Sequence, residues 1–132
     1  MVDDRLIFLI IDDEMATRLM VKAHLRQFNV DFLETKDGNK GLDLMKNSTV
    51  DLVIIDYSMP IISGQEILDI MLEDDKLQNI PAILYTSGGF SKEVEDKLKM
   101  SSTAFLEKMN LGKDLIPIII DILGDRFRKE KD

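Results

Sequence analysis

Three carboxylates stand directly after short apolar stretches of the chain. Asp12 and Asp13 follow the stretch 6–11, and Asp56 follows the stretch 52–55. Continuous, branched apolar runs of this length are typical of strands buried on both faces of a sheet. In a parallel sheet the carboxyl ends of all strands lie on one edge, where binding sites form. We therefore expect the three carboxylates to lie close together there.

Two hydroxyl groups and one amine are predicted at the same edge. Thr86 and Ser87 follow the apolar stretch 82–85, and Lys108 comes shortly after the stretch 103–106. The lysine would supply a positive charge and Thr86 a hydroxyl donor, both of which suit phosphate oxygens.

The acidic residues at this edge favour a divalent cation. Carboxylates about 4 Å apart repel by roughly 4 kcal/mol per pair at an effective dielectric near 20. Oxygen ligands without His or Cys favour Mg²⁺ or Mn²⁺ over Zn²⁺, and Mg²⁺ also recruits phosphate oxygens. The set predicts a phosphoryl-transfer site in which Asp56 is the nucleophile.

Stretches with strand character and stretches with helix character alternate five times along the chain. The predicted strands are 6–11, 31–35 (near a sheet edge), 52–55, 82–85 and 103–106. The predicted helices are 15–28, about 39–47, about 65–73, a short one capped by Ser91, and about 113–128. This alternation predicts an α/β fold with a five-stranded parallel sheet, helices on both faces and right-handed crossovers.

Two helices carry more detailed expectations. An apolar stripe should face the core from the first helix; it consists of Ala16, Leu19, Met20 and Ala23, with Phe28 as a further candidate. The last helix should start no earlier than about residue 113, because Pro117 costs little only in a first turn, where its missing N–H has no intrahelical partner.

Length and composition indicate one globular domain. The chain has 132 residues, of which 45% are hydrophobic and 32% are charged, and we expect a core over about 5–128 with a polar tail at 129–132. The net charge of −8 argues against nucleic acid and favours a cation or a basic protein surface as partner.

Processing and membrane signals are not found in the sequence. Residues 1–5 lack the basic start and cleavage site of a signal peptide, and no apolar run approaches the ~20 residues of a membrane span. The absence of Cys excludes disulfides and thiol chemistry. We expect a cytoplasmic protein with no membrane partner.

The order of these motifs resembles that of receiver domains of the two-component response regulators, especially the stand-alone, chemotaxis-like kind. The resemblance covers about 6–127 and rests on Asp12-Asp13, on Asp56-Tyr57-Ser58-Met59-Pro60 with Gly64, on Thr86-Ser87 and on Lys108. It implies a single receiver domain over 1–132 with a flavodoxin-like, doubly wound (βα)₅ fold and the strand order 2-1-3-4-5.

The resemblance also assigns roles at the acidic site. Asp56 would accept a phosphoryl group from the phosphohistidine of a sensor histidine kinase or a phosphotransfer protein. Asp13 would be the main carboxylate ligand of Mg²⁺ (or Mn²⁺), with Asp12 helping, partly through water. The backbone carbonyl of Ser58 would be a further ligand.

A conformational switch is implied as well. Thr86 and Lys108 would bind the acyl phosphate, and Thr86 would move toward it while the strand-five aromatic, here Phe105, turns inward. The readout surface would be the fourth helix, fifth strand and fifth helix, roughly 91–127. Through this surface the chain would act as a monomer or weak dimer on a downstream protein target. It would be no enzyme beyond self-phosphorylation from a phosphodonor and slow autodephosphorylation.

The chain departs from the family pattern at several positions. Met109 stands where proline usually follows the lysine, so a cis peptide is not expected, since non-proline cis bonds cost ~3 kcal/mol. Phe105 replaces the commoner tyrosine and cannot donate a hydroxyl hydrogen bond. Ser58 and Gly88 carry no long side chain to orient an attacking water, so we expect no special self-hydrolysis.

Other interpretations remain open from the sequence. The chain could be a pseudo-receiver, a phosphorylation-independent binding module, as the missing Lys-Pro step would suggest. A Mg²⁺-dependent phosphohydrolase of the haloacid-dehalogenase type would need Asp-x-Asp on the first strand, whereas this chain has adjacent Asp12 and Asp13. The acidic residues 12–14 could instead cap the first helix, and the lone His24 is more typical of a surface or packing residue than of a phosphoryl carrier.

Overall fold

A five-stranded parallel sheet forms the centre of the molecule. The computed structural model describes residues 5–101 and 103–130. The strands are β1 (Leu6–Ile11), β2 (Val30–Thr35), β3 (Leu52–Asp56), β4 (Ala82–Thr86) and β5 (Ala104–Glu107). Their order is β2-β1-β3-β4-β5, and every neighbouring pair is parallel. The predicted doubly wound α/β fold and its 2-1-3-4-5 order are confirmed, and β2 lies at the expected edge.

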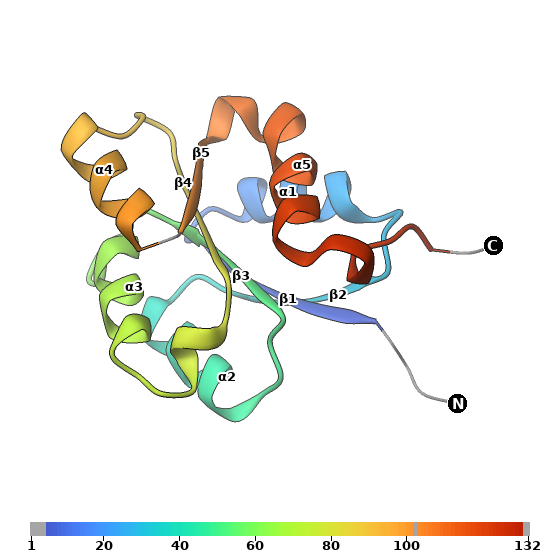
Figure 1. The fold of residues 1–132 in the computed structure, drawn as a ribbon, viewed down its shortest axis with the longest axis horizontal. Coiled ribbons are helices and arrows are strands. Elements are labelled where there is room, and N and C mark those ends of the chain that lie inside the picture. Colours follow the sequence, from blue (N-terminus) through green and yellow to red (C-terminus); the bar gives the residue numbers. More distant parts are fainter. Residues whose placement is uncertain (1–4, 102, 131–132) are drawn as a thin grey trace.

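Helices cover both faces of this sheet. They are α1 (Met15–Leu25), α2 (Gly38–Asn47), α3 (Gly64–Leu72), α4 (Lys92–Met100) and α5 (Leu111–Leu123), with 3₁₀ turns η1 (Leu77–Asn79), η2 (Lys108–Asn110) and η3 (Gly124–Arg126). In Figure 1, α1 and α5 lie above the sheet and α2 and α3 below it. None of the helices within the described ranges has the length and apolar character needed to cross a bilayer.

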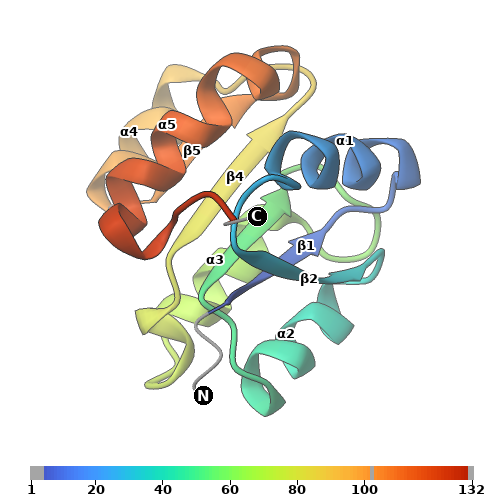
Figure 2. The ribbon, with the colours of Figure 1, turned by 90° about the vertical axis from the view of Figure 1, so that its right-hand side faces the viewer.

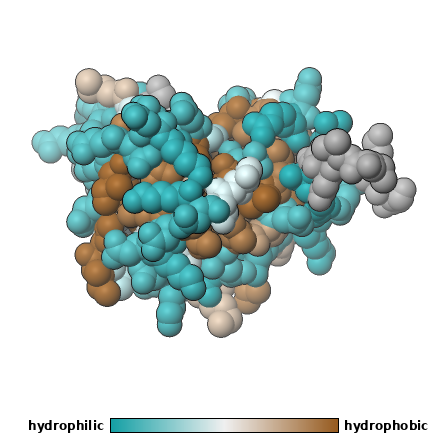
Figure 3. Space-filling view, turned by 90° about the horizontal axis from the view of Figure 1, so that it is seen from below, coloured by the Kyte–Doolittle hydropathy of each residue, from teal (hydrophilic) through white to brown (hydrophobic). Residues whose placement is uncertain are grey.

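Successive strand residues point into two separate cores. Phe8 and Ile10 of β1 pack with residues of α1 and α5, whereas Leu9 and Ile11 pack with residues of α2, α3 and α4. This alternation is the period-two geometry of a strand, and it explains why the strands are apolar on both faces. On the face that carries α2 and α3, apolar surface shows between polar side chains (Figure 3).

The predicted apolar stripe of the first helix is wrong. Leu19 and Met20 are half exposed, and α1 instead buries Val21 and Leu25 and ends at Leu25 rather than at residue 28. Arg18, one turn before Val21 on the same side of the helix, is partly buried. Its guanidinium donates to the Asp12 carbonyl at 2.7 Å and to Glu34 at 2.8 Å. Compared with the prediction, α1 is therefore rotated about its axis. Arg18 faces the sheet edge, whereas periodicity alone assigns this position to solvent.

The last helix begins and ends earlier than predicted. It starts at Leu111, so Pro117 lies inside it rather than in its first turn. Leu111, Leu115 and Ile119 are all buried on one face, and their burial outweighs the backbone hydrogen bond that the proline cannot make. The helix stops at Leu123 because Gly124 has φ = 56°, a conformation that favours glycine.

After this glycine the chain turns back across the end of α1. Phe127 stacks on Phe28 with ring centroids 4.1 Å apart and on Phe8 at 6.0 Å. The Glu130 N–H donates to the Gln27 carbonyl at 2.8 Å. The predicted polar tail is therefore paired as far as residue 130, and 131–132 lie outside the described residues.

Loss of the Phe127 ring should destabilise the fold strongly. Because this side chain is buried against two other aromatic rings, Phe127→Ala should lower the free energy of unfolding by about 3–5 kcal/mol. Ile120→Ala, at a half-exposed position of the neighbouring helix, is the control and should cost about 1 kcal/mol or less. Urea unfolding followed by circular dichroism measures both variants. Equally small losses for the two would contradict a stabilising role of the Phe127 ring in this core.

Candidate functional site

Three carboxylates meet at the carboxyl edge of the sheet, as expected. Asp12 follows β1, Asp56 ends β3, and these two strands are neighbours; Figure 2 shows the arrows of β1, β3 and β4 pointing toward this edge. One carboxylate oxygen from each of Asp12, Asp13 and Asp56 lies within 4.8 Å of the others. Asp12 and Asp56 are buried and Asp13 is exposed. An all-oxygen donor set with one open side fits a hard divalent cation.

The loop after β3 is packed tightly against Asp56. The Ser58 N–H donates to Asp56 Oδ1 at 3.1 Å, and the Gly64 N–H donates to the Tyr57 carbonyl at 3.0 Å. A Cβ at position 64 would lie 2.6 Å from the Asp56 carbonyl oxygen, so only glycine allows this approach. Ser63 caps α3 in a capping box with Glu66, which fixes the far end of the loop.

Lys108 reaches the acidic cluster although no proline follows it. Its Nζ lies 3.3 Å from Asp12 Oδ2, 3.4 Å from Asp56 Oδ2 and 3.2 Å from Glu14 Oε1. No cis peptide occurs among the described residues, so the Lys108–Met109 bond is trans, as predicted. The 3₁₀ turn η2 starts at this lysine and leaves Met109 exposed. Glu14 is a member of this network that the sequence analysis considered only as a helix cap.

A buried tyrosine completes the network. Tyr85 is fully buried, and its hydroxyl donates to Asp12 Oδ2 at 2.5 Å. The Lys108 Nζ lies 5.0 Å from the centre of its ring. Along the sequence Tyr85 follows the pattern of an apolar strand residue. Only the pairing of β3 with β4, in which Tyr85 is the partner of Asp56, brings it to the cluster.

Thr86 and Phe105 lie on the other face of the sheet. Tyr85 belongs to the core of α1 and α5, so the next residue, Thr86, points to the opposite side. The Thr86 hydroxyl accepts a hydrogen bond from the Gly88 N–H at 3.4 Å. Phe105 packs against the core of α2, α3 and α4. The structure thus gathers the carboxylates and Lys108, whereas the contacts of Thr86 and Phe105 lie on the other face of the sheet.

One aromatic residue that the sequence analysis did not single out lies beside Phe105. Phe90, in the loop after β4, meets the Phe105 ring edge-on with centroids 5.3 Å apart. It also meets Tyr57, the residue after Asp56, at 5.2 Å. A row of three rings therefore connects the loop after β3 to β5.

Burial and neighbouring charges shift the ionisation of the site. Burial, together with the charge of Asp12, raises the pKa of Asp56 to about 6, against a smaller opposing effect of the Ser58 N–H and Lys108. Burial lowers the pKa of Lys108, but Asp12 and Asp56 outweigh it and leave that pKa raised. Burial and the hydrogen bond to Asp12 raise the pKa of Tyr85. At neutral pH Asp56 is thus ionised, Lys108 charged and the Tyr85 phenol protonated.

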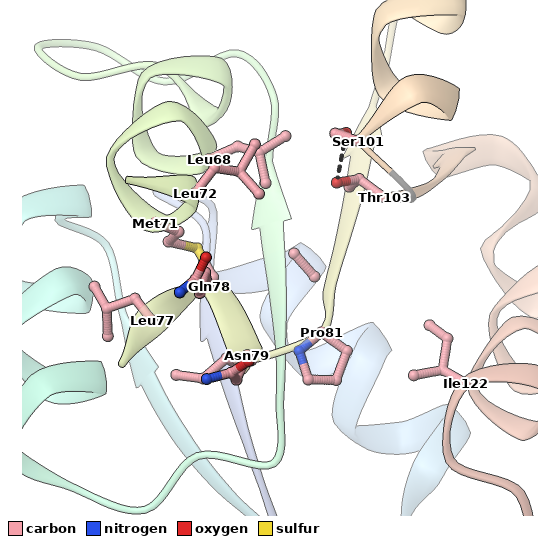
Figure 4. Close-up of a pocket in the computed structure, with 12 residues that line it drawn as sticks. Leu68, Met71, Leu72, Leu77, Gln78, Asn79, Pro81, Ser101, Thr103 and Ile122 are labelled. Carbon is pink, nitrogen blue, oxygen red and sulfur yellow. Dashed lines mark hydrogen bonds between the residues drawn. The ribbon is translucent and has the colours of Figure 1, made fainter. Parts of the chain in front are cut away.

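A hollow lies at the opposite edge of the sheet from the acidic cluster, where β4 begins. It holds about 300 Å³ and is lined by Leu68, Met71, Leu72, Leu77, Gln78, Asn79, Ile80, Pro81, Ala82, Ser101, Thr103 and Ile122 (Figure 4). No titratable side chain is among these residues. The Ser101 and Thr103 hydroxyls are bonded to each other at 2.9 Å. This hollow therefore offers no chemistry comparable to that of the acidic cluster.

The raised pKa of Asp56 makes stability depend on pH in a defined direction. The Asp56 carboxyl binds its proton more tightly in the folded state than in the unfolded state. Above pH 6 the ionised carboxylate therefore lowers the free energy of unfolding, and this loss disappears as the pH falls toward 4. Without divalent metal, Asp56→Asn should therefore stabilise the protein more at pH 7.5 than at pH 4.5, by about 2 kcal/mol.

Urea unfolding in EDTA at the two pH values measures this difference. Ile120→Ala, which removes no titratable group from a half-exposed position of α5, is the control and should change stability equally at both. A larger gain for Asp56→Asn at pH 4.5 would contradict the assignment.

Comparisons with known proteins agree with this geometry. The response regulator receiver domain family matches residues 8–120. A chemotaxis protein CheY homolog of Campylobacter jejuni is 30% identical over 118 residues, which cover 88% of this chain and 91% of the relative.

Two solved structures share the fold. The signal receiver domain of a putative LuxO repressor protein from Vibrio parahaemolyticus has a TM-score of 0.82 at 22% identity, covering 92% of each chain. The Mn²⁺-bound form of response regulator Rcp1 has a TM-score of 0.77 at 19% identity, covering 91% of this chain and 96% of that one. The chain belongs to the response regulator receiver domain family of two-component signalling.

Proposed function

We propose that this receiver domain is a phosphorylation-controlled signalling switch whose phosphoryl acceptor is Asp56. The observation that carries the proposal is the position of this carboxylate. It is buried at the end of β3, within reach of two further carboxylates and 3.4 Å from the Lys108 ammonium. We further propose that the chain, 1–132, is a single receiver domain with its core over about 5–128.

The acidic cluster would hold Mg²⁺ or Mn²⁺. Asp13 is its exposed member and would be the main carboxylate ligand, with Asp56 and the Ser58 carbonyl. Both Asp12 oxygens already accept hydrogen bonds, Oδ1 from the Glu14 N–H and Oδ2 from Tyr85, which supports a role for Asp12 partly through water. The Mn²⁺-bound form of Rcp1 supports a divalent cation in this fold. When bound, the cation would offset the negative charge of an incoming phosphoryl group.

Phosphoryl transfer would use the ionised Asp56. One of its carboxylate oxygens forms a bond to phosphorus while the bond from phosphorus to the donor's imidazole nitrogen breaks, and the donor histidine leaves as neutral imidazole after taking up a proton. Lys108 would then shift its contact from the free carboxylates to the phosphoryl oxygens, and Thr86 would donate its hydroxyl to them. The chain would catalyse no turnover beyond this self-phosphorylation and slow autodephosphorylation.

The switch would run from Thr86 to the surface of α4, β5 and α5. Thr86 and Phe105 lie on the same face of the sheet, and Phe90 contacts Phe105 edge-on. If Thr86 gives up the Gly88 N–H to approach a phosphoryl group, the loop that carries Phe90 must rearrange. Phe105 could then turn inward and alter the surface over 91–127, where a downstream protein would bind the chain as a monomer or weak dimer.

The phosphodonor would be a sensor histidine kinase or a phosphotransfer protein. Large apolar side chains are exposed on the segments that follow the carboxyl ends of three strands, namely Met15 after β1, Ile61 after β3 and Met109 after β5. Ile61 has φ = 73°, a costly conformation for a β-branched residue. A strained and exposed isoleucine in the loop that follows Asp56 supports docking of a partner protein at this edge.

A phosphodonor assay tests the proposed function. With Mg²⁺ and acetyl phosphate, the intact mass should rise by one phosphoryl group, and EDTA should abolish the gain. Asp56→Asn should remove the gain completely, whereas Asp121→Asn should keep it. No gain together with no Mg²⁺ binding would favour a phosphorylation-independent binding module. Continuous turnover of many donor molecules per protein would favour a phosphohydrolase.

A further inference from the structure

Tyr85 is a polar residue in a core of apolar side chains. It is fully buried among residues of β1, β3, α1 and α5, where packing alone requires no hydroxyl group. Its hydroxyl points at Asp12 Oδ2, and the 2.5 Å distance is that of a hydrogen bond from a hydroxyl to a charged carboxylate. The tyrosine therefore contributes a specific contact to the acidic cluster in addition to its volume.

The same side chain also supports Lys108. The lysine Nζ lies 5.0 Å from the centre of the Tyr85 ring, a distance at which the face of an aromatic ring attracts a cation. This Nζ contacts the same oxygen, Asp12 Oδ2, that accepts the tyrosine hydrogen bond. Ring and hydroxyl together hold Asp12 and Lys108 in a defined arrangement.

The Tyr85 hydroxyl would matter most when Lys108 leaves Asp12. A phosphoryl group on Asp56 would draw the Lys108 ammonium away from Asp12. A buried carboxylate that loses its charged partner is costly unless another donor remains. The Tyr85 hydroxyl is such a donor, so Asp12 stays bonded and oriented when Lys108 moves.

We propose that Tyr85 is a positioning residue of the divalent-cation and phosphoryl site, in which its hydroxyl orients Asp12 and its ring supports Lys108. This inference rests on the proposed function, because it assigns the cluster a cation. It goes beyond that function by placing a member of the site inside the core, on the β4 residue that pairs with Asp56.

Tyr85→Phe tests the hydroxyl alone, since it keeps the ring and its packing. Loss of a hydrogen bond that orients a metal-site carboxylate typically costs 10–100-fold in metal affinity. We therefore expect the Mg²⁺ dissociation constant, measured by calorimetry on the full chain, to rise about tenfold or more. Tyr57→Phe removes the chain's other phenol hydroxyl and should leave the constant unchanged. Wild-type affinity in Tyr85→Phe would overturn the inference.

A double-mutant cycle separates positioning from general loosening of the fold. In an Asp12→Ala background the tyrosine hydroxyl has no carboxylate to orient, so adding Tyr85→Phe should change Mg²⁺ affinity by less than twofold. An undiminished loss in that background would show that the hydroxyl does not act through Asp12, and would overturn the inference.

A spectroscopic readout needs no change at position 85. The chain has two tyrosines and no tryptophan, so Tyr57→Phe makes Tyr85 the sole source of tyrosine absorbance. Titration with Mg²⁺ should then perturb its near-ultraviolet spectrum, with a midpoint equal to the calorimetric dissociation constant. A spectrum that stays unchanged while calorimetry shows binding would overturn the inference but leave the proposed function standing. Absence of both Mg²⁺ binding and phosphoryl gain in the wild type would overturn both.

Discussion

Two buried carboxylates on neighbouring strands, Asp12 and Asp56, are the constraint on which the rest of the site depends. Their mutual repulsion and their burial oppose folding, and burial with the Asp12 charge raises the pKa of Asp56 to about 6. The fold offsets this cost with Lys108, which contacts both carboxylates, and with the Tyr85 hydroxyl. The single positive charge of Lys108 does not balance the carboxylates of Asp12, Asp13 and Asp56, so the edge is suited to a divalent cation.

The two faces of the sheet separate the acidic cluster from the residues that we propose as the switch. Asp12 and Lys108 meet Tyr85 on the side of α1 and α5, whereas Thr86 and Phe105 lie on the side of α2, α3 and α4. Adjacent residues of β4, 85 and 86, therefore serve opposite faces. Because β4 is the neighbour of β3, its end places one residue on each of these faces next to the strand that carries Asp56.

The loop after β3 contains one closely packed residue, Gly64, and one strained residue, Ile61. Gly64 allows the loop after β3 to lie against the Asp56 carbonyl at a distance that no side chain would permit. Ile61, in the same loop, adopts a left-handed conformation while almost fully exposed. At the far end of the sheet, Phe127 closes the core of α1 and α5 after Gly124 has ended the last helix. Stability is thus concentrated in the core, and strain lies beside the candidate site.

The apolar patterns of the chain were enough to predict the alternation of strands and helices. They also predicted that Asp12, Asp13, Asp56 and Lys108 meet, because parallel strands end on one edge. The face that α1 buries, the bounds of α5 and the place of Tyr85 in the acidic cluster depend instead on tertiary contacts. Periodicity records which residues are apolar but not which neighbours they meet. Arg18 is partly buried because its guanidinium bonds to Glu34. Leu111 belongs to α5 because its side chain is buried in the core. Tyr85 follows the apolar pattern of a core strand, and its hydroxyl has a carboxylate partner because the end of β1 places Asp12 beside it.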